Sequence, residues 1–139
     1  MFNPLKNNKT MPYADLIREQ QEIQDGLESI VIVNCLGDIP GGRTLDVSGV
    51  ANGTTVIKSG HILIASDKGV VKPMPLNSGG NAYGSLPANH SYLGVLKATV
   101  SVKDPRAAIL TMGQVNQAAC PFPVTNAMKT ALPNIQWLY

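Results

Sequence analysis

The sequence predicts a mainly β fold: a small β-barrel or β-sandwich with an N-terminal arm and helix and a short C-terminal helix. The chain has 139 residues, the size of one ordinary domain. Its β-branched and apolar residues gather in two blocks, 54–65 and 94–116. A turn signal closes the first block at Ser66–Gly69, and another at Lys103–Pro105 divides the second into a hairpin-like pair. From Val95 to Val102 apolar and polar residues partly alternate, as expected where one face is buried.

The first 29 residues form a separate unit ahead of the β-rich unit 30–139. Residues 1–12 are polar and without periodicity, which predicts an arm that a partner orders. From Tyr13 to about Ser29 the pattern predicts an amphipathic helix, because apolar positions recur at three- and four-residue steps. The positions on this stripe are Leu16, Ile17, Gln20, Ile23, Leu27 and Ile30. The pattern favours a helix packed on its own domain, with a short inter-subunit bundle as the alternative. Gln20 at a seam position and the short run argue against a long coiled coil.

The segment after the helix predicts two strands joined by a loop. Ile30–Val33 is an apolar β-branched run, expected to be a buried strand, and residues 34–42 are expected to break it. Pro40-Gly41-Gly42 predicts a turn, after which Arg43–Val47 continues as a strand. A phosphate-binding loop needs Gly-Lys-Ser/Thr opening a helix, so these glycines do not indicate one.

The remaining elements follow from prolines and caps. Val70–Leu76 predicts an edge strand, since its prolines cannot donate to a sheet. The long Gly- and Asn-rich loop 77–89 is where we expect a contact surface. Thr125 or Asn126 caps a predicted short helix that runs through Leu132. The last five residues, 135–139, predict an apolar strand that needs burial in the sheet or against a neighbouring subunit.

Composition and charge exclude several classes of protein. The net charge is +2 and charged residues are few, so no nucleic-acid footprint stands out. No long apolar run and no leader pattern indicates membrane insertion or secretion. Cys35 and Cys120 are expected to be buried free thiols, with a long-range disulfide as the less favoured alternative. We expect no metal, no cofactor, no membrane partner and no direct nucleic-acid contact.

The search for catalytic residues yields none. His61 lies in an apolar strand without a Cys, His or acid at ligand spacing, and His90 adjoins Ser91 on a loop. A triad from Ser91, His61 and Asp46 has no nucleophile elbow or other context to support it. We therefore expect satisfied or solvated histidines, no catalytic, cofactor-binding or metal-binding residues, and no enzymatic activity.

Several segments in order carry a resemblance to a known group of proteins. They are Gly53–Gly60, Lys72-Pro73, Ser85–Leu96, Ala107–Asn116 and Thr130–Pro133. This order of strand, glycine and turn positions resembles head-decoration and head-fibre proteins of tailed bacteriophages, the group that contains lambda-type capsid decoration proteins. The resemblance covers about residues 42–137 and leaves out the segment 1–29.

The resemblance implies an auxiliary capsid protein with a small β-rich domain. Such a protein binds the outer surface of the phage capsid, with the major capsid protein as partner, and strengthens the shell, usually as a homotrimer. Its location would be the virion. The alternative is a β-rich carbohydrate-binding or adhesion module. That class normally displays several exposed aromatic side chains, and this chain has one Trp and four Tyr.

Overall fold

The computed structural model describes residues 28–139, and they form a mainly β fold. The predicted arm 1–12 and nearly all of the predicted helix 13–29 lie outside the described residues. In chain order the elements are α3 (Glu28–Val31), β1 (Ile32–Asp38), β2 (Arg43–Thr44), β3 (Val56–Ile57), β4 (Ile62–Ser66), β5 (Val71–Pro73), β6 (His90–Leu96), β7 (Val100–Ser101), β8 (Arg106–Ala107), β9 (Ile109–Asn116), the 3-10 turn η1 (Gln117–Ala119), α4 (Asn126–Ala131) and β10 (Ile135–Leu138).

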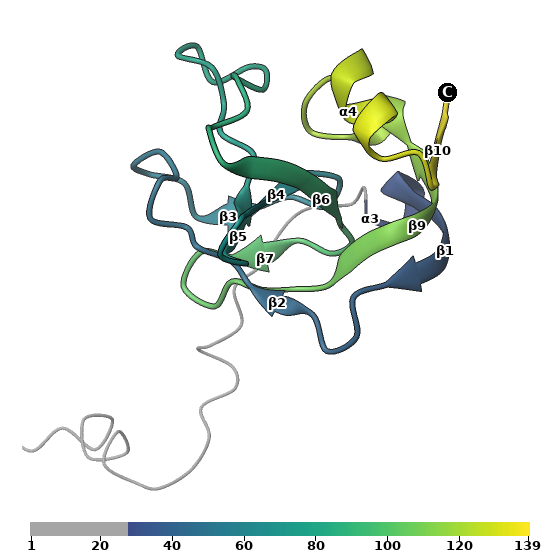
Figure 1. The fold of residues 1–139 in the computed structure, drawn as a ribbon, viewed down its shortest axis with the longest axis horizontal. Coiled ribbons are helices and arrows are strands. Elements are labelled where there is room, and N and C mark those ends of the chain that lie inside the picture. The colour runs from purple at the N-terminus through teal and green to yellow at the C-terminus, as the bar shows by residue number, and fades with distance from the viewer. Residues whose placement is uncertain (1–27) are drawn as a thin grey trace, which may run out of the picture.

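One six-stranded sheet organises the fold, with the strand order β1-β9-β6-β4-β5 (Figure 1). Strand β10 pairs parallel with the second half of β9, at Ile135↔Gly113 to Leu138↔Asn116. All other pairs of this sheet are antiparallel. Two small sheets, β2-β8 and β3-β7, accompany it. Because β1 and β5 are the two ends of the strand order, the sheet does not close into a barrel.

Both faces of the large sheet are covered by apolar side chains. In the central strand β4, Ile62 and Ile64 belong to one buried cluster and Leu63 belongs to the other. Successive side chains of a strand point to opposite faces, so the two clusters lie on opposite sides of the sheet. The first cluster includes side chains of α3, α4 and β10, and the second includes side chains of the two small sheets.

Local signals predicted several elements correctly. The turn at Ser66–Gly69 forms, with the Gly69 amide donating to the Ser66 carbonyl at 3.0 Å, and β5 is an edge strand. The Pro40–Gly42 turn also forms. Helix α4 is capped by Thr125, whose side chain accepts from the Met128 amide. The C-terminal strand is present as β10.

The predicted buried strand over Ile30–Val33 is right only in part, because Ile32 and Val33 belong to β1 but Ile30 and Val31 are helical. Helix α3 ends at Val31, and β1 continues through Asp38, where a break was expected. Val31 is fully buried, whereas Ile30 is 47% exposed and Val33 is 46% exposed. Every residue of the run Ile30–Val33 is apolar. However, β1 is an edge strand, and its residues Val33 to Leu36 are exposed to solvent.

Four further predictions also need correction. The strand expected from Arg43 to Val47 is confined to β2, and the expected strand 94–102 divides into β6 and β7 around Lys97–Thr99. The hairpin-like pairing of the second block is limited to Val95↔Leu110 and Leu96↔Ile109. His90, which was placed in a loop, begins β6.

The predicted loop 77–89 extends from the sheet between β5 and β6, as Figure 1 shows. Its base is a small antiparallel bridge, Leu76↔Tyr83, supported by the Asn77 amide donating to the Ala82 carbonyl at 2.9 Å. Tyr83 is 8% exposed and belongs to the first apolar cluster. The loop therefore has a buried anchor and an exposed polar tip, Asn77–Asn81. Its role as a contact surface stays a prediction.

Candidate functional site

The residues considered for a triad do not form one. His61 is 5% exposed, and its Nε2 donates to the Met74 carbonyl at 3.1 Å. Ser91 is exposed on β6, in register with Ala65. Asp46 accepts hydrogen bonds from the amide and hydroxyl of Ser48, which lower the pKa of its carboxyl. His61 and Asp46 thus have hydrogen-bond partners that serve local structure.

His61 belongs to an aromatic cluster with Tyr83 and Phe122. Its ring meets Tyr83 edge-on at 5.3 Å between centroids and Phe122 at 5.6 Å, and the latter two rings are 5.4 Å apart. The Tyr83 hydroxyl accepts from the Ile62 amide at 3.0 Å. Burial lowers the pKa of His61 to about 4 and raises the pKa of Tyr83. His61 is therefore neutral at pH 7, and the cluster fastens loop 77–89 and the segment after η1 to the sheet.

The second histidine is also engaged with the backbone. The Nδ1 of His90 donates to the Ala88 carbonyl at 2.7 Å, and the residue is partly exposed at the start of β6. The expectation of satisfied or solvated histidines is confirmed for both His61 and His90. Neither lies in a group that is typical of metal binding: within residues 28–139, no three His, Cys, Asp or Glu side chains gather to hold an ion.

The two cysteines are free, but the expectation that both are buried is wrong. Cys35 is exposed on β1, and Cys120 is partly buried, where burial raises the pKa of its thiol to about 11. Near Cys35, Lys97 Nζ donates to Asp38 Oδ2 at 3.0 Å. This carboxylate and the Cys35 side chain raise the pKa of Lys97. The pair joins β1 to the segment after β6 at the surface, where such pairs contribute little stability.

A cleft with a volume of about 540 Å³ lies beside Ile30. Its walls are Ile30, Lys58, Ser59, Asn116, Ala118, Ala119, Cys120 and Pro121. Two of the polar side chains that line it have partners: Ser59 Oγ donates to the Lys97 carbonyl at 2.9 Å, and Asn116 Oδ1 accepts from the Ala118 amide. The Cys120 thiol donates weakly to the Asn116 carbonyl at 3.5 Å. The residues that line this cleft favour binding of an apolar side chain over catalysis.

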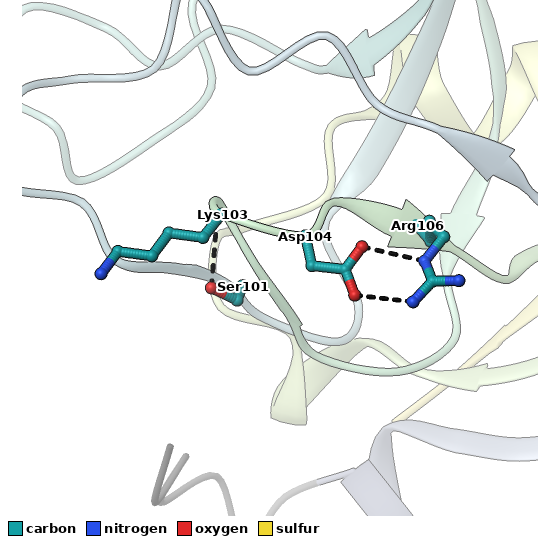
Figure 2. A network of polar contacts seen from close by, with 4 residues as sticks. All are labelled: Ser101, Lys103, Asp104 and Arg106. Atoms are coloured by element: carbon teal, nitrogen blue, oxygen red, sulfur yellow. Dashed lines mark hydrogen bonds and ion pairs between the residues drawn. The ribbon is translucent and has the colours of Figure 1, made fainter. Parts of the chain in front are cut away.

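A shallow hollow of about 440 Å³ lies between β2 and β8, next to Arg43 and Arg106. Figure 2 shows that Arg106 is already paired there, because its Nε and Nη2 donate to the two carboxylate oxygens of Asp104 at 2.9 and 2.8 Å. In the same turn the Lys103 amide donates to Ser101 Oγ at 3.2 Å. These contacts stabilise the turn between β7 and β8. Of the two arginines beside the hollow, they leave Arg43 as the one outside this network.

Exposed apolar side chains gather at β1. Seven large apolar residues of the described chain are exposed, and three of them, Ile30, Val33 and Leu36, fall within seven consecutive positions. A fourth, Met112, is paired across from Gly37 on β9 and is 43% exposed. We call Val33, Leu36 and Met112 the β1 surface. Exposed apolar patches mark interaction sites, and these three side chains all belong to the paired strands β1 and β9. The sequence did not reveal this surface, because exposure of an apolar run depends on which neighbours the fold supplies.

The β1 surface also includes a free strand edge. In the part of the chain that the structure describes, β1 pairs with β9 alone, so its outer edge presents unpaired amide and carbonyl groups. No helix within residues 28–139 has the length and apolar character to cross a membrane. Searches of family models, curated proteins and solved structures found no match for this chain.

Proposed function

We propose that the protein is a viral structural protein, an auxiliary capsid protein of the head-decoration or head-fibre class of tailed bacteriophages. In this role it binds the outer surface of the capsid as a homotrimer, contacts the major capsid protein and stabilises the shell. It has no enzymatic activity. Its two-faced sheet, covered by apolar clusters on both sides, is then a sandwich-like version of the decoration-protein domain.

The observation that carries the proposal is the β1 surface, with its free strand edge and exposed apolar side chains. An edge strand can accept a strand from a partner, so that main-chain hydrogen bonds supply affinity and side-chain pockets supply specificity. The buried and polar groups of the described chain serve local structure, which fits a protein that works by contact. The order of strand, glycine and turn positions over residues 53–133 indicates the phage class.

The mechanism of stabilisation follows from repetition. Many small bound proteins with weak individual contacts reinforce a shell when each of them binds several coat subunits at once. The second binding event of a trimer is intramolecular, so avidity exceeds the affinity of one protomer. A domain of this kind needs adhesive surfaces and a rigid core.

The test is quantitative mass spectrometry of purified phage particles from the genome that encodes this chain. A ratio near one copy per major capsid protein supports a decoration protein that covers the lattice. A much lower ratio supports a head fibre or vertex protein. Absence from the particle contradicts the proposal and favours the carbohydrate-binding or adhesion module. Little supports that module now, since Tyr139 is the one aromatic residue among the large exposed apolar side chains of residues 28–139.

A further inference from the structure

The cleft beside Ile30 and the exposed strand β1 share one stretch of the chain. Ile30 forms a wall of the cleft, and β1 begins two residues later. Asn116, another wall residue, directly follows Val115, which pairs with Ile32 at the start of β1. Val33 is the next residue of β1 and is 46% exposed. The cleft and the β1 surface therefore adjoin each other where β1 begins.

The cleft combines apolar walls with one cation. Its apolar wall residues are Ile30, Ala118, Ala119 and Pro121. Lys58 also lines the cleft, is exposed, and makes no ion pair with any residue from 28 to 139. With about 540 Å³, the cleft is within the usual size range of ligand pockets, roughly 300–1,000 Å³. Such a cleft fits an apolar side chain that has a carboxylate close to it.

The charges of the β-rich unit also favour an acidic partner. Residues 30–139 contain eight Lys and Arg residues but four Asp and no Glu. Two of these carboxylates are already held in ion pairs. At the far end of β1 the charges of Asp38 and Lys97 neutralise each other, whereas Lys58 at the cleft has no counter-charge among the described residues. An acidic group of a partner is therefore complementary to the cleft end of this surface.

The irregular shape of β1 limits how a partner can pair with its edge. The register between β1 and β9 shifts at three places along the seven residues of β1: Ile32/Asn34, Cys35/Gly37 and Gly37/Asp38. Such irregularities bend and twist a strand, and they protect an exposed edge against long strand pairing. A partner therefore gains few main-chain hydrogen bonds at β1, and the cleft is the better source of a specific contact.

We propose that the cleft beside Ile30 anchors a short extended segment of the major capsid protein. One apolar side chain of that segment enters the cleft, a neighbouring acidic side chain pairs with Lys58, and the segment continues over Val33 towards Leu36. Burial of the apolar side chain supplies affinity, and the charge of Lys58 disfavours basic segments. This inference rests on the proposed function, and it names the kind of coat segment that the protein recognises.

The two free cysteines report on the two parts of this contact. Cys35 is exposed on β1, and Cys120 lines the cleft. The test is labelling of both thiols with N-ethylmaleimide, followed by mass spectrometry of the peptides. It compares the free full-length protein with the protein bound to purified shells that lack it. We expect shell binding to slow the labelling of both cysteines by about tenfold or more, because reactivity requires access to the thiol.

Variants at the cleft separate the effect of shape from that of charge. Ala118→Phe fills the cleft from an exposed wall position and should raise the apparent Kd for shells by about tenfold or more. Lys58→Gln should raise it by about threefold to fivefold, and Lys58→Arg should keep the wild-type value because it keeps the charge. Ala51→Phe and Lys68→Gln are the matched controls, since both residues are exposed and neither lines the cleft. Circular dichroism shows whether each variant keeps its β fold.

Three results would overturn the inference. If both thiols of the shell-bound protein react as fast as in the free protein, the contact lies on another surface. Protection of Cys35 alone would mean that the partner covers β1 without an anchor in the cleft. Wild-type shell binding by both Ala118→Phe and Lys58→Gln would mean that the cleft is not used. A wild-type protein that does not bind shells at all contradicts the proposed function itself and this inference with it, which is a different result from binding without protection.

Discussion

His61 couples the stability of the fold to pH, because it is buried as a neutral ring. In the unfolded chain a histidine has a pKa near 6.5, while burial lowers the pKa of His61 to about 4 in the folded protein. Below pH 6.5 the unfolded chain therefore binds a proton that the folded chain does not. The full contribution is present above pH 6.5, declines as the pH falls, and is lost by pH 4. We expect a loss of about 3 kcal/mol in the free energy of unfolding.

Urea denaturation at pH 7.5 and at pH 4.5 measures this effect before most carboxylates titrate. His61→Gln keeps an amide donor for the Met74 carbonyl and should remove most of the pH dependence, although the variant is less stable. His90→Gln is the matched control. It should keep the wild-type difference in the free energy of unfolding between the two pH values, since His90 is partly exposed. If wild type and His61→Gln show the same change in the free energy of unfolding between the two pH values, another group causes the pH dependence.

Trp137 carries a buried indole N–H group. Its side chain packs against the first apolar cluster, and within residues 28–139 its Nε1 has no hydrogen-bond partner. An unpaired buried donor costs free energy, whereas an apolar replacement of similar shape avoids that cost. We expect Trp137→Phe to leave the free energy of unfolding within about 1 kcal/mol of wild type. Trp137→Ala should lower it by about 2 kcal/mol or more, because it leaves a cavity.

Denaturant titrations of the two Trp137 variants separate these contributions. A large loss on Trp137→Phe would mean that the indole N–H has a partner in solution, for example in a neighbouring subunit. Similar small losses for both variants would mean that strand β10 contributes little to the core.

At the scale of the element, the pairing between β6 and β9 is short and depends on Gly94. The two strands pair at Val95↔Leu110 and Leu96↔Ile109 alone. A Cβ on Gly94 would overlap the backbone carbonyl oxygen of Leu110 and lie 3.0 Å from Ile109 Cγ2. We expect Gly94→Ala to lower the free energy of unfolding by about 2 kcal/mol or more, since both strands must separate to admit the methyl group.

Gly49 offers a matched control for this prediction. A Cβ there meets no atom within 4 Å, and its backbone does not need glycine. Gly49→Ala should change the free energy of unfolding by less than about 0.5 kcal/mol. If the two variants lose equal free energy of unfolding, strands β6 and β9 can separate enough to accommodate a side chain at Gly94.

The elements also show which features a sequence can predict. Helix α4 and the turn at Ser66–Gly69 were predicted because caps, prolines and glycines act within a few residues. The exposure of β1 was not predictable in this way. An apolar run looks the same whether its strand is central or at an edge, and that depends on pairing with β9, about 75 residues further along the chain. The cluster of His61, Tyr83 and Phe122 likewise joins three distant segments.

At the scale of the whole molecule, three exposed apolar side chains lie near the N-terminal end of the described residues. The exposed residues Ile30, Val33 and Leu36 follow directly on the N-terminal segment. The polar tip of loop 77–89 is carried by a separate anchor at Tyr83. Partner contact through the β1 surface would therefore use a different part of the chain from the loop tip. In the proposed homotrimer the predicted arm 1–12 is present in three copies.

That arrangement predicts what the arm does on a shell. Deletion of residues 1–12 should keep the trimer and the β domain but weaken binding to capsids that lack this protein, because three identical contacts are lost together. With multivalent engagement, the apparent Kd should rise by about tenfold or more. Co-sedimentation with purified shells measures the change, and Val70→Asn in the full-length chain serves as the control. If the deletion leaves shell binding unchanged, the arm has no part in capsid contact, and the β1 surface remains as the candidate for that role.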